Sequence, residues 1–226
     1  MNGAGRPLVA LDLDGTLGDY HKHFLRFAEG WLGYKLNDPE EINPGLPLWE
    51  FMGVHETIYR KIKLAFRQGG MKRTMPAYDG VGSLSTAIHE AGADLWICTT
   101  RPYMKHDSID EDTLEWLRRN RVDFDGLIYD NVGMKGSKYQ ELNRQVGDRV
   151  AAIIDDLPEM LLEVNKIIGE GGFNNIQFLG CRTQPYNRNL NALSLGVTRV
   201  SSVMSAIDPI RDAIGRWRLE DGRLYR

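Results

Sequence analysis

The chain has 226 residues, of which 42% are hydrophobic and 26% charged, and its formal net charge is −3. This length suits one core domain with room for a smaller module, and the acidic balance argues against duplex nucleic acid as the main partner. No apolar run reaches the ~18 residues that a membrane span needs, so we expect no membrane partner and a cytoplasmic protein. The two cysteines, Cys98 and Cys181, lie in apolar runs and are expected to be reduced and buried.

The first predicted element is a buried strand over residues 8–14, which ends in two aspartates. Residues 20–77 then interrupt the pattern, with helical stretches at 21–36 and 56–70 around a segment rich in Pro, Gly and Asn at 37–53. No strand is predicted there. We therefore expect a helical cap at 20–77, inserted after the first strand of a core formed by residues 1–19 and 78–226.

After residue 77, predicted strands alternate with predicted helices. Apolar segments typical of buried parallel strands fall at 93–100, 126–130, 149–156 and 175–181, and amphipathic helical segments at 81–92, 110–120, 137–145 and 157–168. Such alternation predicts an α/β fold with a Rossmann-like parallel sheet. The tail, 217–226, is expected to form a short hairpin around Asp221 and Gly222 or to fray.

Polar residues follow four of the predicted strands. The candidate site residues are Asp12, Asp14, Thr99, Thr100, Arg101, Lys135, Lys138, Asp155 and Asp156. In open α/β sheets ligands bind at the carboxyl ends of the strands, so these groups should meet there. Four carboxylates in one crevice repel each other, and a hard divalent cation such as Mg²⁺ removes that cost and binds phosphate.

These motifs together resemble the four motifs of the haloacid dehalogenase (HAD) superfamily. DLDGT at 12–16, the threonine after the second strand, the Lys–Gly pair at 135–136 and IIDD at 153–156 stand in the family's order. The resemblance implies a Rossmann-like core with a C1-type cap, as the insertion at 20–77 suggests. It also implies phosphatase chemistry that depends on Mg²⁺.

The resemblance assigns roles to the catalytic residues. Asp12 is expected to be the nucleophile that forms an aspartyl-phosphate, and Asp14 the general acid and then the base. Thr99 is expected to hydrogen-bond the phosphoryl group, with Thr100 as the alternative. Lys135 is expected to neutralise charge on the nucleophile and the phosphoryl group.

Several site assignments stay open at this stage. Lys135 fits the family pattern, but Lys138 lies three residues further on the same helix face and is the alternative. Arg101 is either a surface cation or a phosphate contact. The metal is expected to be held by Asp12, by the main-chain carbonyl of Asp14 and by Asp156. Asp155 would act through water or hold Asp156 in place.

Other segments resemble the 5′(3′)-deoxyribonucleotidase family. These are WICTTRP at 96–102, residues 75–92 before it, TQPYNR at 183–188 and RVSSV at 199–203, which is in place for that family's last strand. The cap sequence shows no such match. Trp49 or Phe51 would then stack on a nucleobase, although the preferred interpretation of the cap aromatics is that they form the core of a helical cap.

The expected function is that of a phosphomonoesterase for a small phosphorylated metabolite. Deoxyribonucleoside monophosphates are the first candidate substrates. A sugar phosphate, a polynucleotide 3′-phosphate, transfer to an acceptor other than water, and a non-catalytic phosphate-binding module are the alternatives. A homo-oligomer is compatible with the sequence.

Overall fold

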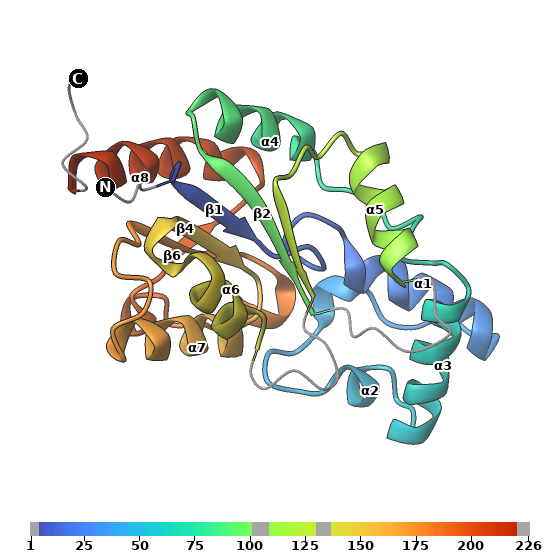
Figure 1. Ribbon diagram of the computed structural model, residues 1–226. Helices are drawn as coiled ribbons and strands as arrows, with labels where there is room; N and C mark the ends of the chain where they lie inside the picture. Colours follow the sequence, from blue (N-terminus) through green and yellow to red (C-terminus); the bar gives the residue numbers. More distant parts are fainter. Residues whose placement is uncertain (1–4, 101–108, 130–136, 221–226) are drawn as a thin grey trace.

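The computed structural model describes residues 5–100, 109–129 and 137–220 of the chain (Figure 1). A six-stranded sheet, in the order β3-β2-β1-β4-β5-β6, forms its centre, and every neighbouring pair is parallel. The strands are β1 (Leu8–Leu11), β2 (Asp94–Thr99), β3 (Gly126–Tyr129), β4 (Val150–Asp155), β5 (Phe178–Arg182) and β6 (Thr198–Val200). This confirms the predicted α/β fold with a Rossmann-like parallel sheet.

Helices cover both faces of the sheet (Figure 1). One layer contains α4 (Val81–Glu90), α5 (Ile109–Arg119) and α8 (Ile207–Glu220), and the other contains α6 (Lys138–Val146) and α7 (Pro158–Gly169). In β1, Val9 and Leu11 face the first layer while Leu8 and Ala10 face the second. Both faces are apolar because a parallel sheet is buried on both sides.

The C-terminal end of the chain differs from the sequence-based prediction. α8 continues to Glu220, so a hairpin or frayed end beginning at Trp217 is wrong; Asp221 and Gly222 lie outside the described residues. The buried indole of Trp217 packs this helix against the protein, 2% exposed. Burial of that ring favours a continued helix over a local turn.

The segment 20–77 contains α1 (Tyr20–Leu32), the 3₁₀ turn η1 (Pro39–Glu41), α2 (Leu48–Phe51) and α3 (Glu56–Gln68). Phe24, Ile62 and Phe66 are fully buried in a hydrophobic cluster of its own. Figure 1 shows these helices together, beyond the ends toward which the arrows of β1 and β2 point. The separate cluster supports the predicted division into cap and core, which stays a prediction.

The two ends of the cap segment leave the core side by side and are joined by backbone hydrogen bonds. Gly18 bridges antiparallel to Ala77, the amide of Asp19 donates to the carbonyl of Pro76 at 2.8 Å, and the amide of Tyr78 donates to Leu17 at 2.9 Å. The chain therefore leaves and re-enters the core at one place. Among the described residues, no helix has the length and apolar composition needed to cross a bilayer.

Candidate active site

Asp12 follows β1 and lies beside a buried lysine. Lys138, the first residue of α6, is fully buried, and its Nζ lies 2.5 Å from Oδ1 of Asp12 and 2.7 Å from Oδ2 of Asp155. Burial alone would lower the pKa of Lys138, but the two carboxylates outweigh it and raise that pKa. The structure thus places Lys138 in the site, while Lys135 and Arg101 lie outside the described residues.

Ser137 explains why Lys138 points inward. Its Oγ accepts hydrogen bonds from the amides of Tyr139 and Gln140, which caps α6 and starts the helix at Lys138. A serine followed three residues later by glutamine is a known helix-start signal. That signal was available in the sequence and would have favoured Lys138.

The two aspartates at the end of β4 are held by different partners. Asp155 accepts hydrogen bonds from the hydroxyl of Tyr139 at 2.7 Å and from the amide of Leu157 at 2.8 Å. Asp156 accepts a hydrogen bond from Oγ1 of Thr16 at 3.0 Å and another from the hydroxyl of Tyr186. Both carboxylates are fully buried, so their orientation is fixed by these contacts.

Asp12, Asp155 and Asp156 form a cluster suited to a cation. Each offers a carboxylate oxygen, and these oxygens lie within 4.8 Å of one another. Burial raises the pKa of Asp12 to about 7, although the positive charge of Lys138 acts in the opposite direction. The pKa of Asp156 is raised well above its usual range, first by burial and then by the negative charge of Asp155. One lysine does not balance three carboxylates, and an all-oxygen donor set fits a hard divalent cation.

The turn after β1 brings backbone close to this cluster. Gly15 has a φ of 96°, and a Cβ at this position would lie 2.6 Å from Oη of Tyr186 and closer still to the carboxylate of Asp156. Only glycine accommodates both the positive φ and this approach. The DLDGT motif therefore supplies the glycine as well as the aspartates.

Asp14 pairs with a residue of the cap segment. Lys72, 6% exposed, forms an ion pair with Oδ2 of Asp14, and its Nζ lies 3.9 Å from the ring centroid of Tyr20. His21 is next to Tyr20 and its ring lies 4.3 Å from that of Tyr186. Sequence reasoning missed Lys72 and Tyr186 as site residues because each comes from a distant segment and neither belongs to a motif with assigned chemistry.

The two threonines after the second strand have different surroundings. Along β2, Ile97 faces one helix layer and Cys98 the other, so by alternation Thr99 points away from the face of Asp12 and Thr100 toward it. Thr99 is fully buried, with no hydrogen-bond partner for Oγ1 among the described residues, whereas Thr100 lines the cavity above Asp12. The geometry therefore favours the alternative, Thr100, over Thr99.

A cavity of about 890 Å³ lies between the cap segment and the strand ends. Its lining residues are Asp12, Asp14, Tyr20, His21, Leu48, Tyr59, Arg60, Lys63, Leu64, Arg67, Lys72, Thr100, Asp156, Leu157 and Glu159. Trp49 and Phe51, which were expected to stack on a nucleobase, are not among them, so the structure does not bring either residue to this cavity. The short helix α2 directs Leu48 into the cavity, while Phe51 packs against the cap cluster and Trp49 is half-buried elsewhere.

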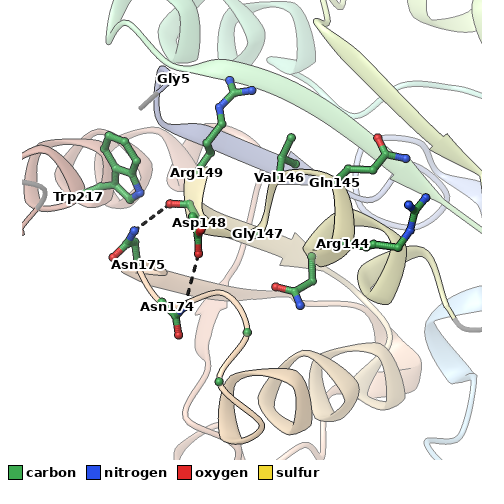
Figure 2. A pocket seen from close by; sticks show the side chains of 13 residues that line it. Gly5, Arg144, Gln145, Val146, Gly147, Asp148, Arg149, Asn174, Asn175 and Trp217 are labelled. Carbon is green, nitrogen blue, oxygen red and sulfur yellow. Dashed lines mark hydrogen bonds between the residues drawn. The ribbon is translucent and has the colours of Figure 1, made fainter. Parts of the chain in front are cut away.

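A second polar hollow, of about 670 Å³, lies near the amino ends of the strands (Figure 2). Figure 2 shows its asparagines turned toward the loop before β4: Asn174 donates to Oδ1 of Asp148, and Asn175 donates to the carbonyl of Asp148 at 2.8 Å. Oδ1 of Asn143 accepts a hydrogen bond from the amide of Phe173 at 3.0 Å. These side chains hold loops together, at the opposite end of the strands from the carboxylate cluster.

The two cysteines take no part in the site. Both are buried and free, as expected, and burial raises the pKa of Cys98 to about 12 and that of Cys181 to about 11. These shifts disfavour the thiolate, which is the nucleophilic form of cysteine, at neutral pH.

Comparisons with known proteins identify the fold. No family model matches the sequence, and no curated protein matches it either. A predicted phosphatase from Clostridium acetobutylicum is similar in structure, with a TM-score of 0.62 at 17% identity over 92% of this chain and 99% of that one. A HAD-superfamily hydrolase of subfamily IA from Geobacter sulfurreducens gives a TM-score of 0.54 at 16% identity over 92% and 98%.

A third similar structure contains a phosphorylated sugar. CbbY from Rhodobacter sphaeroides, in complex with xylulose-(1,5)bisphosphate, gives a TM-score of 0.52 at 14% identity over 88% of this chain and 95% of that one. At these identities the likeness concerns the fold. The resemblance to the HAD superfamily is thus confirmed at the level of the fold, while that to the deoxyribonucleotidases is not confirmed. The chain has the fold of the HAD-superfamily phosphatases and hydrolases.

Proposed function

We propose that this protein is a Mg²⁺-dependent phosphomonoesterase that works through an aspartyl-phosphate. The observation that carries the proposal is the placement of Asp12. Its carboxylate contacts the buried Lys138 at 2.5 Å, belongs to the three-carboxylate cluster and lines the cavity at the carboxyl ends of the strands.

In the first step a carboxylate oxygen of Asp12 attacks the phosphorus of the substrate. The bond between phosphorus and the ester oxygen breaks, and Asp14 gives a proton to the leaving alcohol. The ammonium of Lys138 stabilises the negative charge that gathers on the phosphoryl group, and Thr100, which lines the cavity, donates a hydrogen bond to it.

In the second step a water molecule attacks the phosphorus of the aspartyl-phosphate. Asp14, now deprotonated, takes a proton from this water, the bond to Asp12 breaks, and inorganic phosphate leaves. The sum of the two steps consumes one water and restores both carboxyl groups.

The residues of the cluster fit a magnesium ion. Asp12 and Asp156 would hold it, together with the main-chain carbonyl of Asp14, while Asp155 is held by Lys138 and Tyr139. When bound, the cation neutralises charge and orients the phosphoryl group. Thr16 and Tyr186 keep the carboxylate of Asp156 in its orientation.

The finer proposal is that deoxyribonucleoside monophosphates are substrates. It is supported by the sequence segments described above and by apolar surface in the cavity, from Tyr20, Leu48 and Tyr59. A sugar phosphate uses the same catalytic residues and is the alternative; CbbY, which shares the fold, was crystallised with one.

Replacement of Asp12 tests the proposal directly. The wild-type protein should release phosphate from an aryl phosphate when Mg²⁺ is present, and Asp12→Asn should lose this activity while its circular dichroism spectrum is unchanged. Full activity of Asp12→Asn would exclude the aspartyl-phosphate. No release by the wild type at any pH between about 5 and 9 would favour a phosphate-binding module instead. A panel of nucleotides, sugar phosphates and 3′-phosphorylated oligonucleotides then identifies the substrate.

A further inference from the structure

A smaller cavity, of about 380 Å³, lies beside the active-site cavity, where β5 and β6 end. Residues of α1 and η1 line this side cavity from the cap segment, and residues that follow β5 and β6 line it from the core. Among the described residues, His21 alone lines both cavities. The proposed reaction uses none of the other residues around the side cavity, which therefore has no assigned role.

Arg182, the last residue of β5, is the buried cation of the side cavity. It is 8% exposed, and its Nη1 donates hydrogen bonds to the carbonyls of Thr183 at 2.9 Å and Ser201 at 2.6 Å. Its guanidinium carbon lies 4.7 Å from the ring centroid of Tyr78. Among the described residues, Nε of Arg182 has no hydrogen-bond acceptor, and no carboxylate forms an ion pair with this guanidinium. Buried arginines are usually paired with an acid, so this one keeps a charge that an anion in the cavity can balance.

The charges around the side cavity indicate which anion fits. It is lined by three cations and two carboxylates: Lys22, Arg182, Arg188, Asp19 and Glu40. One positive charge is left over, because His21 is neutral at pH 7: burial and then the positive charge of Lys72 lower its pKa to about 4. A carboxylate carries one negative charge and its two oxygens match the donors of a guanidinium. A phosphate monoester carries nearly two charges at neutral pH, so the balance favours the carboxylate.

Gln184 connects the side cavity with the active site. It lines the side cavity, and its Nε2 donates hydrogen bonds to the hydroxyl of Tyr78 at 2.8 Å and to the carbonyl of Gly15 at 2.5 Å. Two residues further along the chain, the hydroxyl of Tyr186 donates to the carboxylate of Asp156. A ligand in the side cavity therefore lies against the segment that holds the turn after β1 and one carboxylate of the cation cluster.

We propose that the side cavity binds a small carboxylic acid that is not the substrate, that Arg182 binds its carboxylate, and that this ligand changes the affinity of the carboxylate cluster for Mg²⁺. A volume of about 380 Å³ lies in the range of ligand-binding cavities. Pro39, Ile42 and Pro185 supply apolar surface for the rest of the ligand. The inference goes beyond the proposed function, because this ligand is bound and not turned over.

Benzoate and benzamide are the matched probes for the site, because they have nearly the same shape and only benzoate is charged. Calorimetry on the full chain measures their affinities. We expect benzoate to bind at least about tenfold more tightly than benzamide, since one charge-assisted hydrogen bond is sufficient for that ratio. Equal affinities, or no binding of benzoate at tens of millimolar, would overturn the proposal. Phenylphosphonate tests the choice of anion: binding tighter than that of benzoate and dependent on Arg182 would exclude a carboxylate site.

Variants of the buried arginine locate the bound probe. Arg182→Met should weaken the binding of benzoate by at least about tenfold and leave that of benzamide unchanged. Arg182→Lys keeps the charge without the fork of donors and should retain part of the affinity. Circular dichroism confirms that both variants fold. Unchanged binding of benzoate by a folded Arg182→Met protein would place the probe elsewhere and overturn the proposal.

A second pair of variants serves if replacement of the buried arginine prevents folding. Lys22 and Arg26 are both exposed residues of α1, but only Lys22 lines the side cavity. We expect Lys22→Ala to weaken the binding of benzoate about two- to fivefold, as is typical of an exposed charge, and Arg26→Ala to leave it unchanged. An equal response of the two variants would show a general charge effect and contradict the proposal.

Titration of Mg²⁺ with and without benzoate tests the connection to the active site. We expect the Kd for Mg²⁺ to differ at least about threefold between the two titrations, and the Kd for benzoate to change by the same factor when Mg²⁺ is added. Arg182→Met should remove the difference. Equal Kd values would overturn the connection. Because these measurements need no turnover, benzoate binding can be confirmed or excluded even if no phosphate ester is hydrolysed.

Discussion

The ammonium group of Lys72, near the end of the cap segment, forms an ion pair with the carboxylate of Asp14 in the core. Both side chains are largely shielded from water, at 7% and 16% exposure. The proposed general acid is therefore held by a residue from the inserted segment. The position of the segment that carries Lys72 therefore bears on the position of the Asp14 carboxylate.

Replacement of this lysine should weaken the fold as well as the activity. In Lys72→Met the carboxylate of Asp14 loses its cation while it stays mostly buried, which we expect to cost roughly 1–3 kcal/mol in the free energy of unfolding. Urea denaturation measures this loss. The double variant Lys72→Met with Asp14→Asn should lose less than the sum of the single variants, because the two residues share one interaction; additive losses would contradict the pairing.

The buried lysine of the site can be identified by comparing two variants. Lys138→Met should lower kcat by about 10²-fold or more, since it removes a positive charge that stabilises the phosphoryl group. Lys135→Met should have the smaller effect. Steady-state kinetics on an aryl phosphate, with circular dichroism to confirm folding, decides the assignment. A larger loss in Lys135→Met would restore the motif-based prediction.

The raised pKa of Asp12 predicts a pH dependence of stability in the metal-free protein. This carboxyl ionises near 3.8 when unfolded and at about 7 when folded. Between these values unfolding releases a proton, so rising pH favours the unfolded state and the destabilising contribution of Asp12 grows from about pH 4 to about pH 7.

The matched variant for this measurement is Asp12→Asn, which does not titrate. The free energy of unfolding of the wild type, minus that of the variant, should fall as the pH rises through this window in the presence of a chelator. Saturating Mg²⁺ should reduce the fall, because a bound cation favours the ionised carboxylate. A difference that rises with pH would contradict the burial of Asp12 as described.

Magnesium should stabilise the protein through the carboxylate cluster. We expect the Tm to rise with Mg²⁺ concentration, because a ligand that binds only the folded state stabilises it. In Asp156→Asn most of this rise should disappear. Asp212→Asn removes an exposed carboxylate of α8 and should keep the full rise. An equal response of the two variants would show that the ion acts elsewhere.

Much of the fold was predictable because its physical signals are local. Strands buried on both faces have apolar runs, and the aspartates after β1 and β4 stand where those runs end. The choice of Lys138 depends on where α6 begins, and thus on the cap made by Ser137. Alternation along β2 determines that Thr100 lines the cavity while Thr99 does not, and composition did not reveal which of the two faces that side.

The cavity wall formed by the cap was not predictable in the same way. Its aromatic residues suggested a stacking surface at Trp49 or Phe51, but Phe51 belongs to the cap cluster, and the cavity is lined by Tyr20 and Tyr59 together with charged residues of α3. Which face of an isolated helix meets the core depends on how the segment is packed against it. Tyr186 reaches Asp156 across 30 positions of sequence, and that distance carries no periodic signal.

The hydrogen bonds that pair Leu17 with Tyr78 and Asp19 with Pro76 give the inserted segment a closed base. Its two ends are already neighbours in the folded core, so the entropy of loop closure grows only slowly with the length of what lies between them. The length of the segment above this base can therefore change at a small entropic cost, and the strand ends that carry Asp12, Asp155 and Asp156 need not move when it does.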